Sequence, residues 1–143
     1  MAFQPKRYII VGNGIAGTTA AETLRQNDPN CVITLITNEP YPLYNRVALP
    51  RYVRGVVDRQ KVYLRDIASH RQKGIDLLVS TSVASVNWQE KTVLTERGKE
   101  FPYDKLLIAT GGRPNKLQVP GSEVRGIFNF QYMDDANGIL ECL

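Results

Sequence analysis

The sequence predicts an α/β fold in which a parallel sheet carries an inserted antiparallel meander of three strands. Three observations support this prediction. An apolar run, an amphipathic helical stretch and a second apolar run follow one another within about 30 residues, the pattern of a βαβ unit. Short β-rich pieces separated by turn-like breaks come later in the chain. A further apolar run that ends in Thr-Gly-Gly then predicts a return to the parallel sheet.

The βαβ unit is predicted near the start of the chain. Its first strand spans Arg7–Gly12, an apolar run ending in glycine that is typical of a buried parallel strand. Its helix spans Gly14–Gln26 and stops before Pro29. Its second strand spans Cys31–Thr37, which is rich in β-branched residues, and we expect Cys31 to be a small buried hydrophobe. One apolar stripe marks the buried face of the helix: Ile15, Thr18, Ala21 and Leu24.

A long irregular segment with three prolines, Asn38–Gln60, follows this unit. Such a segment in a compact domain is usually functional or disordered. We expect a short helix within Asn45–Val53 that is interrupted at Pro50. A second helix is predicted over Val62–Lys73, with the single histidine, His70, on its surface.

The rest of the chain predicts the meander and the return to the parallel sheet. Gly74 ends the second helix, and Ile75–Val79 forms a third parallel strand. The meander lies at about residues 83–104, with strands at Val83–Trp88, Lys91–Glu96 and Glu100–Tyr103. A buried strand, a short strand and the start of a helix follow, at Lys105–Ala109, Val124–Phe130 and Asp134–Leu143. The apolar face of that helix holds Ala136, Ile139, Leu140 and Leu143.

Composition and charge exclude several classes of protein. With 143 residues, of which 43% are hydrophobic and 22% charged, the chain has the profile of one globular domain. Its apolar runs fall short of the ~18–20 residues of a transmembrane helix, so we expect neither a membrane span nor a secretory signal. The net charge of +4 is small. A loose group of basic residues between Arg46 and Lys61 lacks the pattern of a nucleic-acid-binding module, and the alternative that it forms a positive patch facing one phosphorylated ligand is left open. Two cysteines without a C-x-x-C motif disfavour a metal knuckle or a redox dithiol and fit a cytoplasmic setting.

A glycine motif joins the first strand to the first helix. It is a G-x-G-x-x-G formed by Gly12, Asn13, Gly14, Ile15, Ala16 and Gly17. Gly12 permits a tight turn, Gly14 lets the backbone approach a pyrophosphate, and Gly17 lets the helix pack on the strand. The helix N-terminus adds free N–H groups and a positive dipole end. Glu39 lies 22 positions after Gly17, where it would accept hydrogen bonds from ribose hydroxyls. This context predicts dinucleotide binding; the alternative is that the glycines only turn the chain and Glu39 is a loop acid.

Two further features give the sequence a resemblance to a known family. The meander stands where a nicotinamide-binding domain has another crossover helix, and the last predicted strand continues into Ala109-Thr110-Gly111-Gly112-Arg113-Pro114. The sequence resembles the FAD-binding half of the glutathione-reductase-like pyridine-nucleotide oxidoreductases, whose second flavin motif is an apolar strand followed by Ala-Thr-Gly-x-x-Pro. The resemblance covers nearly all 143 residues. It implies a Rossmann-like FAD-binding domain over residues 1–143, the N-terminal portion of a flavoprotein with two dinucleotide-binding domains. Residues 134–143 would then lead toward an absent NAD(P)H domain.

The resemblance also implies which residues bind FAD. Val83 matches a valine whose backbone faces the adenine in the family. Arg46, in the segment that begins at Tyr44, matches an arginine along the pyrophosphate or ribityl chain; its alternative is a solvated loop charge. Tyr41 and Tyr44 either cover the flavin or pack under the loop. The predicted cofactor-binding residues are Gly12, Asn13, Gly14, Ile15, Ala16, Gly17, Asn38, Glu39, Arg46, Val83, Ala109, Thr110, Gly111 and Arg113. Neither a catalytic side chain nor a metal ligand is predicted, since the cofactor performs the electron chemistry.

The segment after Glu39 contains no redox cysteine, so the resemblance is nearest to the rubredoxin and ferredoxin reductases and the large subunit of NAD(P)H nitrite reductase. It implies the FAD-binding portion of an NAD(P)H-dependent oxidoreductase that passes electrons through FAD to an acceptor protein or centre. NAD(P)H would bind only in the complete enzyme, and the 143-residue chain alone is expected to be inactive. The alternative is a non-catalytic module that binds FAD or ADP; the meander disfavours a plain NAD-binding dehydrogenase domain. The acceptor, the choice of NADH or NADPH and a homo-oligomeric state are left open.

Overall fold

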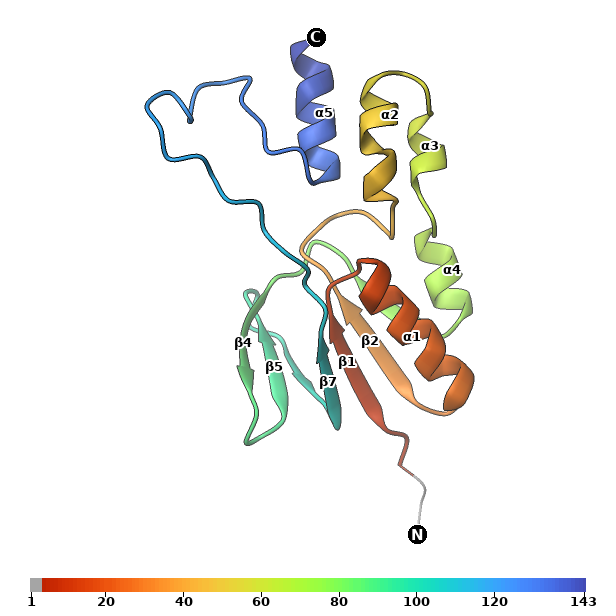
Figure 1. Ribbon diagram of the computed structural model, residues 1–143. Helices are drawn as coiled ribbons and strands as arrows, with labels where there is room; N and C mark the ends of the chain where they lie inside the picture. The colour runs from red at the N-terminus through yellow and green to blue at the C-terminus, as the bar shows by residue number, and fades with distance from the viewer. Residues whose placement is uncertain (1–3) are drawn as a thin grey trace. The chain divides into compact units, whose positions relative to one another are not determined.

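The computed structural model describes residues 4–143, which divide into two compact units (Figure 1). The first, the sheet unit, contains the chain up to Leu43 and the stretch Arg65–Gly111. The second, the helical unit, contains Tyr44–Leu64 and Gly112–Leu143. Each unit is therefore assembled from two stretches that are separated in the sequence.

A four-stranded parallel sheet forms the centre of the sheet unit. Its strands are β1 (Arg7–Val11), β2 (Val32–Ile36), β3 (Ile75–Leu78) and β7 (Lys105–Ile108). Their order is β3-β2-β1-β7, so β1 pairs in parallel with β2 on one side and with β7 on the other. Helix α1 (Ile15–Asn27) makes the crossover from β1 to β2. The predicted βαβ unit is confirmed, with strand bounds within two residues of those expected.

The predicted meander forms a second sheet in the same unit. Its strands are β4 (Val83–Asn87), β5 (Thr92–Thr95) and β6 (Glu100–Pro102), which pair antiparallel in the order β4-β5-β6. A parallel sheet with an inserted three-stranded antiparallel meander is the fold class that the sequence predicts, and it is confirmed.

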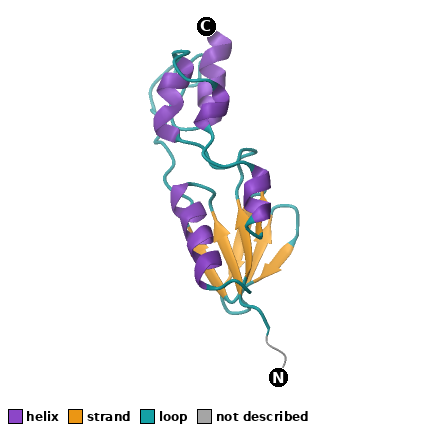
Figure 2. Cartoon of the chain, turned by 90° about the vertical axis from the view of Figure 1, so that its right-hand side faces the viewer, coloured by secondary structure: helices purple, strands orange, loops and turns teal. Residues whose placement is uncertain are grey.

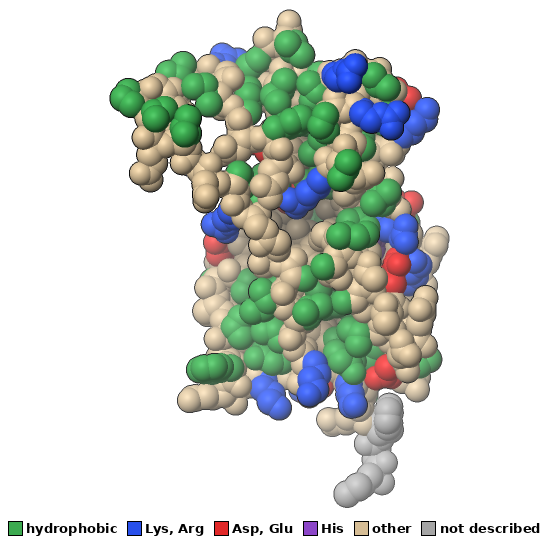
Figure 3. Space-filling view, viewed as in Figure 1, with side chains coloured by type: hydrophobic (Ala, Val, Ile, Leu, Met, Phe, Trp, Pro, Cys, Tyr) green, Lys and Arg blue, Asp and Glu red, His purple; other side chains and the backbone are tan. Residues whose placement is uncertain are grey.

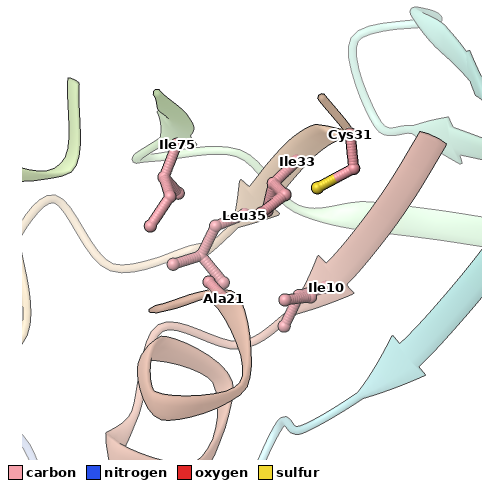
Figure 4. Packing of buried hydrophobic residues seen from close by; sticks show 6 residues of the cluster. All are labelled: Ile10, Ala21, Cys31, Ile33, Leu35 and Ile75. Atoms are coloured by element: carbon pink, nitrogen blue, oxygen red, sulfur yellow. The ribbon is translucent and has the colours of Figure 1, made fainter. Parts of the chain in front are cut away.

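Buried side chains lie on both faces of the parallel sheet, because successive residues of a strand point to opposite faces. On one face Ile10 of β1 packs with Ala21 of α1. Figure 4 shows the six residues of this cluster: Ile10, Ala21, Cys31, Ile33, Leu35 and Ile75. On the other face Ile9 packs with Val93 of β5, beside Ile36 and Tyr103. Helix α1 and the meander therefore cover opposite faces, and Cys31 is buried as expected.

The helical unit contains four helices and no strand of either sheet; Figure 2 colours all helices of the chain purple. The four helices of this unit are the 3-10 helix η1 (Arg46–Ala48) and the α-helices α2 (Leu49–Val53), α3 (Arg59–Val62) and α5 (Met133–Cys142). The Tyr52 hydroxyl donates a hydrogen bond to Oδ1 of Asn137 (3.3 Å), which ties α2 to α5. Met133 at the start of α5 is fully buried, and its N–H donates to the Tyr44 hydroxyl (3.2 Å).

The single helix predicted over Val62–Lys73 is wrong. Helix α3 ends at Val62, the next residue is extended, and α4 (Ile67–Gln72) begins after Asp66. The Asp66 carboxylate accepts the N–H of Ser69 (2.6 Å) and so caps a new helix in mid-segment. His70 on α4 is 2% exposed, which corrects its predicted surface position; its Nδ1 lies 2.9 Å from the Asp66 carbonyl oxygen.

Three smaller expectations also need correction. Pro50 does not interrupt a helix but stands in the first turn of α2, where its missing N–H costs nothing. Residues 124–130 form bends, turns and irregular backbone instead of a strand, with Gly126 at φ +97. Strand β7, expected to be buried, is an edge strand on which Leu107 and Ile108 are exposed. Figure 3 shows such hydrophobic side chains at the surface of the sheet unit.

The predicted apolar faces of two helices are only partly buried. On α1, Thr18 and Ala21 are buried, whereas Ile15 is 66% exposed. On α5, Ala136 is buried and Leu140 is exposed, and Leu143, which follows the last residue of the helix, is also exposed.

Candidate functional site

The predicted glycine loop connects the end of β1 to the start of α1, and Gly12 opens it. The Gly12 N–H donates to the carbonyl of Ile36 (2.8 Å), which extends the pairing of β1 with β2 by one residue. Gly12 has φ +113, a backbone conformation that L side chains rarely adopt. A Cβ at this position would overlap the carbonyl group of Ala109, at the end of β7. Gly12 is therefore required by both the turn and the close approach of two strand ends.

Gly17 and Gly14 differ in what surrounds them. A Cβ at Gly17 would overlap the carbonyl oxygen of Gly12, so this glycine lets the first turn of α1 lie against the loop. Gly14 is the N-cap of α1, and its carbonyl accepts the N–H of Thr18 (3.0 Å). A Cβ at Gly14 would meet no atom within 4 Å. Open space therefore lies beside the first turn of α1, next to the helix N-terminus.

Side-chain hydrogen bonds fix Asn13 in the middle of the loop. The Thr18 hydroxyl donates to Oδ1 of Asn13 (2.9 Å), and Nδ2 of Asn13 donates to the carbonyl of Tyr41 (3.5 Å). Thr18 is 1% exposed, so its hydroxyl needs this partner. The sequence analysis assigned Thr18 only to the apolar stripe of α1. A hydroxyl-bearing residue at a buried helix position was the available signal.

The carboxyl ends of β1, β2 and β7 meet at one edge of the sheet, and predicted site residues follow all three strands. Asn38 and Glu39 come two and three residues after the end of β2. The Glu39 N–H donates to the hydroxyl of Thr37 (3.3 Å), and its carbonyl accepts the N–H of Ser80 (3.1 Å). The Glu39 side chain is half-buried. These bonds hold the backbone of Glu39 at the edge where the glycine loop begins.

The remaining site residues of the sheet unit surround the same edge. The Ala109 N–H donates to the carbonyl of Val11 (2.8 Å), which continues the β1–β7 pairing into the Ala-Thr-Gly segment. Thr110 and Gly111 follow, with Gly111 at φ +67. Val83 is half-buried at the start of β4, and the approach to β4 is fixed by Thr81, whose N–H donates to the carbonyl of Thr37 (2.8 Å).

Two predicted cofactor-binding cations, Arg46 and Arg113, belong to the helical unit, and both are exposed. The Arg46 guanidinium lies over the rings of Tyr44 (5.6 Å to the ring centroid) and Tyr132 (4.8 Å). Tyr44 is 7% exposed and its hydroxyl accepts the Met133 N–H, which favours the interpretation that Tyr44 packs under the loop. Sequence reasoning missed Tyr132, which stands far from Arg46 in the chain.

The loop and its surroundings fit a dinucleotide. Open space lies beside Gly14, and the first turn of α1 contains no acidic side chain that would repel a phosphate. Ile15 and Ala16 contribute backbone N–H groups in that turn, where a helix has no internal partners for them. In strand order β3-β2-β1-β7, the chain runs from β1 to β2 and β3 on one side of β1 and then returns to place β7 on the other side. The strand order therefore reverses between β1 and β7, which is a topological switch point. Ligands of open α/β sheets bind in such crevices.

Other kinds of site find less support within residues 4–143. No group of three or more His, Cys, Asp or Glu side chains is arranged to hold a metal ion. Both cysteines are free, and burial raises the pKa of the Cys31 thiol, which keeps it protonated and unreactive. Over the same residues, no helix has the length and apolarity needed to cross a bilayer.

Known proteins are similar to this chain over most of its length. The family described as pyridine nucleotide-disulphide oxidoreductase matches residues 6–142. An NAD(P)H nitrite reductase of Bacillus subtilis is 34% identical over 94% of this chain and 17% of its own length. The ferredoxin reductase component of a chlorobenzene dioxygenase from a Cupriavidus species is 35% identical over 88% of this chain and 31% of its own. The crystal structure of NADH:rubredoxin oxidoreductase from Clostridium acetobutylicum superposes with a TM-score of 0.85 at 27% identity, covering 96% of this chain and 35% of that one. The chain thus spans 17–35% of the length of these three proteins.

Proposed function

Because the chain belongs to the pyridine nucleotide-disulphide oxidoreductase family, we propose that it is the FAD-binding part of an NAD(P)H-dependent oxidoreductase. In the complete enzyme, electrons pass from NAD(P)H through FAD to an acceptor protein or centre of the ferredoxin, rubredoxin or nitrite-reductase kind. The names of the relatives support this class of reaction.

One observation is central to this proposal: three strand ends place the glycine loop, Glu39 and the Ala109–Gly111 segment at one edge of the sheet. The backbone N–H groups at the start of α1 are oriented to donate to phosphate oxygens in the space beside Gly14. In this proposal, Glu39 accepts hydrogen bonds from the ribose hydroxyls. FAD, when bound, supplies the hydride and electron chemistry, and these residues hold and orient it.

Titration of the purified chain with FAD tests the proposal. We expect FAD to bind, ADP to compete with it, and FMN, which lacks the adenosine half, to compete much more weakly. The variant Glu39→Ala is expected to lose about 10–150-fold in FAD affinity, because the ribose hydroxyls lose a charged acceptor. Quenching of flavin fluorescence reports the affinity.

An exposed acid elsewhere in the sheet unit serves as the matched control. Glu96, at the end of the second meander strand, is exposed, and Glu96→Ala removes the same charge. Its FAD affinity is expected to equal that of the parent chain. If Glu39→Ala and Glu96→Ala lost the same amount of FAD affinity, the effect of Glu39 would come only from the change in net charge. A parent chain that binds neither FAD nor ADP would overturn the proposal.

A further inference from the structure

The chain has a single tryptophan, Trp88, which lies in the turn between β4 and β5. The turn spans residues 88–91, and Trp88 is 81% exposed in it. A tryptophan ring is among the largest apolar surfaces that a fold can bury, and its polar N–H makes it amphipathic. An exposed tryptophan is therefore typical of protein interfaces and of membrane-water interfaces.

Hydrogen bonds order this turn. The Asn87 Oδ1 accepts the N–H of Glu90 (3.1 Å), and the Asn87 Nδ2 donates to the Glu90 carboxylate (3.0 Å). The carbonyl of Lys91 accepts the N–H of Tyr103 (2.8 Å), which ties the end of the turn to the segment just before β7. A turn that is already ordered loses little conformational entropy when it meets a partner.

Three exposed lysines lie near this turn, at the amino ends of the parallel strands. Lys91 is the last residue of the turn, Lys105 is the first residue of β7, and Lys6 precedes β1. The Asp104 N–H donates to the carbonyl of Arg7 (2.9 Å), which joins the starts of β7 and β1 beside the end of the turn. In Figure 3, Lys and Arg side chains follow the lower edge of the sheet unit. Together with the tryptophan, the three lysines form the amino-end surface of this unit.

Acidic side chains beside the amino-end surface are bonded to neighbours. The Asp104 carboxylate accepts the N–H of Arg7 (2.7 Å) and forms a salt bridge with its guanidinium (3.2 Å). The Glu90 carboxylate is bonded to Asn87 within the turn. The Arg7–Asp104 pair is neutral overall, so the three lysines outnumber Glu90 and the surface carries a net positive charge.

We propose that the amino-end surface docks on an anionic lipid surface, with the Trp88 ring among the headgroups and the three lysines paired with lipid anions. Tryptophan is favoured at a membrane-water interface because its ring is amphipathic. Each lysine near an anionic leaflet adds an attraction that requires no shaped pocket. A turn of this size offers much less than the ~800 Å² that each partner buries in a standard protein interface, whereas a lipid surface deforms around one ring.

This docking is separate from the proposed function. The amino-end surface lies at the starts of β1 and β7, whereas the glycine loop follows the other end of β1. Lipid contact at one end of these strands therefore leaves the candidate site at the other end accessible. No step of the inference requires FAD to bind.

Because Trp88 is the single tryptophan, its fluorescence reports directly on the amino-end surface. The purified chain is mixed with vesicles of equal parts phosphatidylserine and phosphatidylcholine, and separately with vesicles of phosphatidylcholine alone. With the anionic vesicles only, we expect the emission to shift to shorter wavelength and its quenching by aqueous acrylamide to fall. Added salt should reverse the shift, because it screens the attraction between exposed charges.

Co-sedimentation with the anionic vesicles measures the affinity of each variant. Trp88→Ala should bind about tenfold more weakly, because no apolar ring leaves water on docking. Lys91→Gln and Lys105→Gln should each bind about fivefold more weakly, because one positive charge fewer is attracted to the lipid surface.

Two control variants make the same kinds of change at the other end of the strands. Arg97 is exposed in the turn after β5, and Arg97→Gln removes one positive charge there. Ile108→Ser removes an exposed apolar side chain from the last residue of β7. Both variants should bind the anionic vesicles like the parent. Thermal unfolding of every variant confirms that the chains compared are folded.

Several results would overturn the inference. One is a parent chain that does not bind the anionic vesicles, or that binds phosphatidylcholine vesicles equally well. Sedimentation without a change in tryptophan emission would place the lipid contact on another surface. Equal losses in Lys91→Gln and Arg97→Gln would show an effect of net charge alone, and an equal emission shift with soluble polyglutamate would assign the surface to an acidic polypeptide. If Trp88→Ala does not fold, the emission shift of the parent and the two lysine variants decide the outcome.

Discussion

Two glycines of the same loop should respond to the same substitution in opposite ways. A Cβ at Gly14 meets no atom within 4 Å, and the residue has an extended backbone with φ −79. A Cβ at Gly12 overlaps the Ala109 carbonyl, and φ is +113. We therefore expect Gly14→Val to remove dinucleotide binding from a folded chain and Gly12→Val to unfold or strongly destabilise it.

The magnitudes follow from the surroundings of each glycine. Valine at Gly14, the N-cap of α1, costs about 1 kcal/mol of stability. Its branched side chain occupies the space beside the helix N-terminus, and losing two charge-assisted hydrogen bonds of about 1.5–3 kcal/mol each lowers affinity more than about 100-fold. At Gly12, a strained backbone costs about 1–3 kcal/mol, and the overlap with fixed backbone adds about as much again. That sum is a large part of the ~5–15 kcal/mol that stabilises an ordinary domain.

Two measurements on each variant test this reasoning. Circular dichroism during heating should show a small fall in Tm for Gly14→Val and a fall of more than about 10 °C for Gly12→Val. Titration with FAD should show binding lost in Gly14→Val while the chain stays folded. A Gly14→Val chain that binds FAD within threefold of the parent would refute the placement of the phosphates, and a Gly12→Val chain as stable as the parent would refute the argument from close approach.

Three further outcomes are expected. Hydrogen bonds from Arg65 and Lys73 lower the pKa of Glu22 to about 2 from an ordinary 4.5, so the carboxylate stabilises the fold above pH 4.5 and this contribution is lost as the pH falls toward 2. Glu22→Gln should therefore cost about 1–2 kcal/mol in urea unfolding at neutral pH, allowing for partial exposure, and clearly less at pH 3; an equal cost at both pH values would contradict this. The 143-residue chain with added FAD should oxidise NADH and NADPH far more slowly than about 1 per second, because no second glycine fingerprint follows Gly17. Loss of nicotinamide absorbance at an ordinary enzymatic rate would contradict this prediction. Ile108→Lys, on an exposed edge strand, should leave Tm nearly unchanged and reduce concentration-dependent light scattering, and a large fall in Tm would show that Ile108 is buried in solution.

The sequence predicted the elements whose signals are local. Each of these signals is contained in a short stretch of sequence: the apolar runs of β1, β2 and β7, and the glycine between β1 and α1. The structure forms these elements where they were expected. The turns of the meander are equally local. Burial of β7 was mispredicted because an apolar strand looks the same in the sequence whether it is central or at the edge, and its position depends on which strands pair with it.

The segment between β2 and β3 was predicted less well, because competing local signals had to be weighed there. One helix was predicted over residues 62–73, but the Asp66 carboxylate accepts the Ser69 N–H and so caps a new helix, α4, that begins at Ile67. His70 was assigned to the surface because it stands in the polar stretch Arg65–Lys73. Its burial depends on α4 packing against β3, which the periodicity of one short helix does not specify.

The candidate site shows the same division between local and distant signals. The glycine spacing identified the loop, but the reason for Gly12 includes the carbonyl of Ala109, and the orientation of Asn13 depends on Thr18 and on the carbonyl of Tyr41. The motif shows that a glycine is needed at this turn. The atoms that would clash with a side chain there, those of the Ala109 carbonyl, are identified only by the fold. The ring over Arg46 is the extreme case, because Tyr132 belongs to no motif and reaches Arg46 only through the folding of the helical unit. Residues that belong to a local motif are therefore easier to find in a single sequence than residues that contact the motif only after folding.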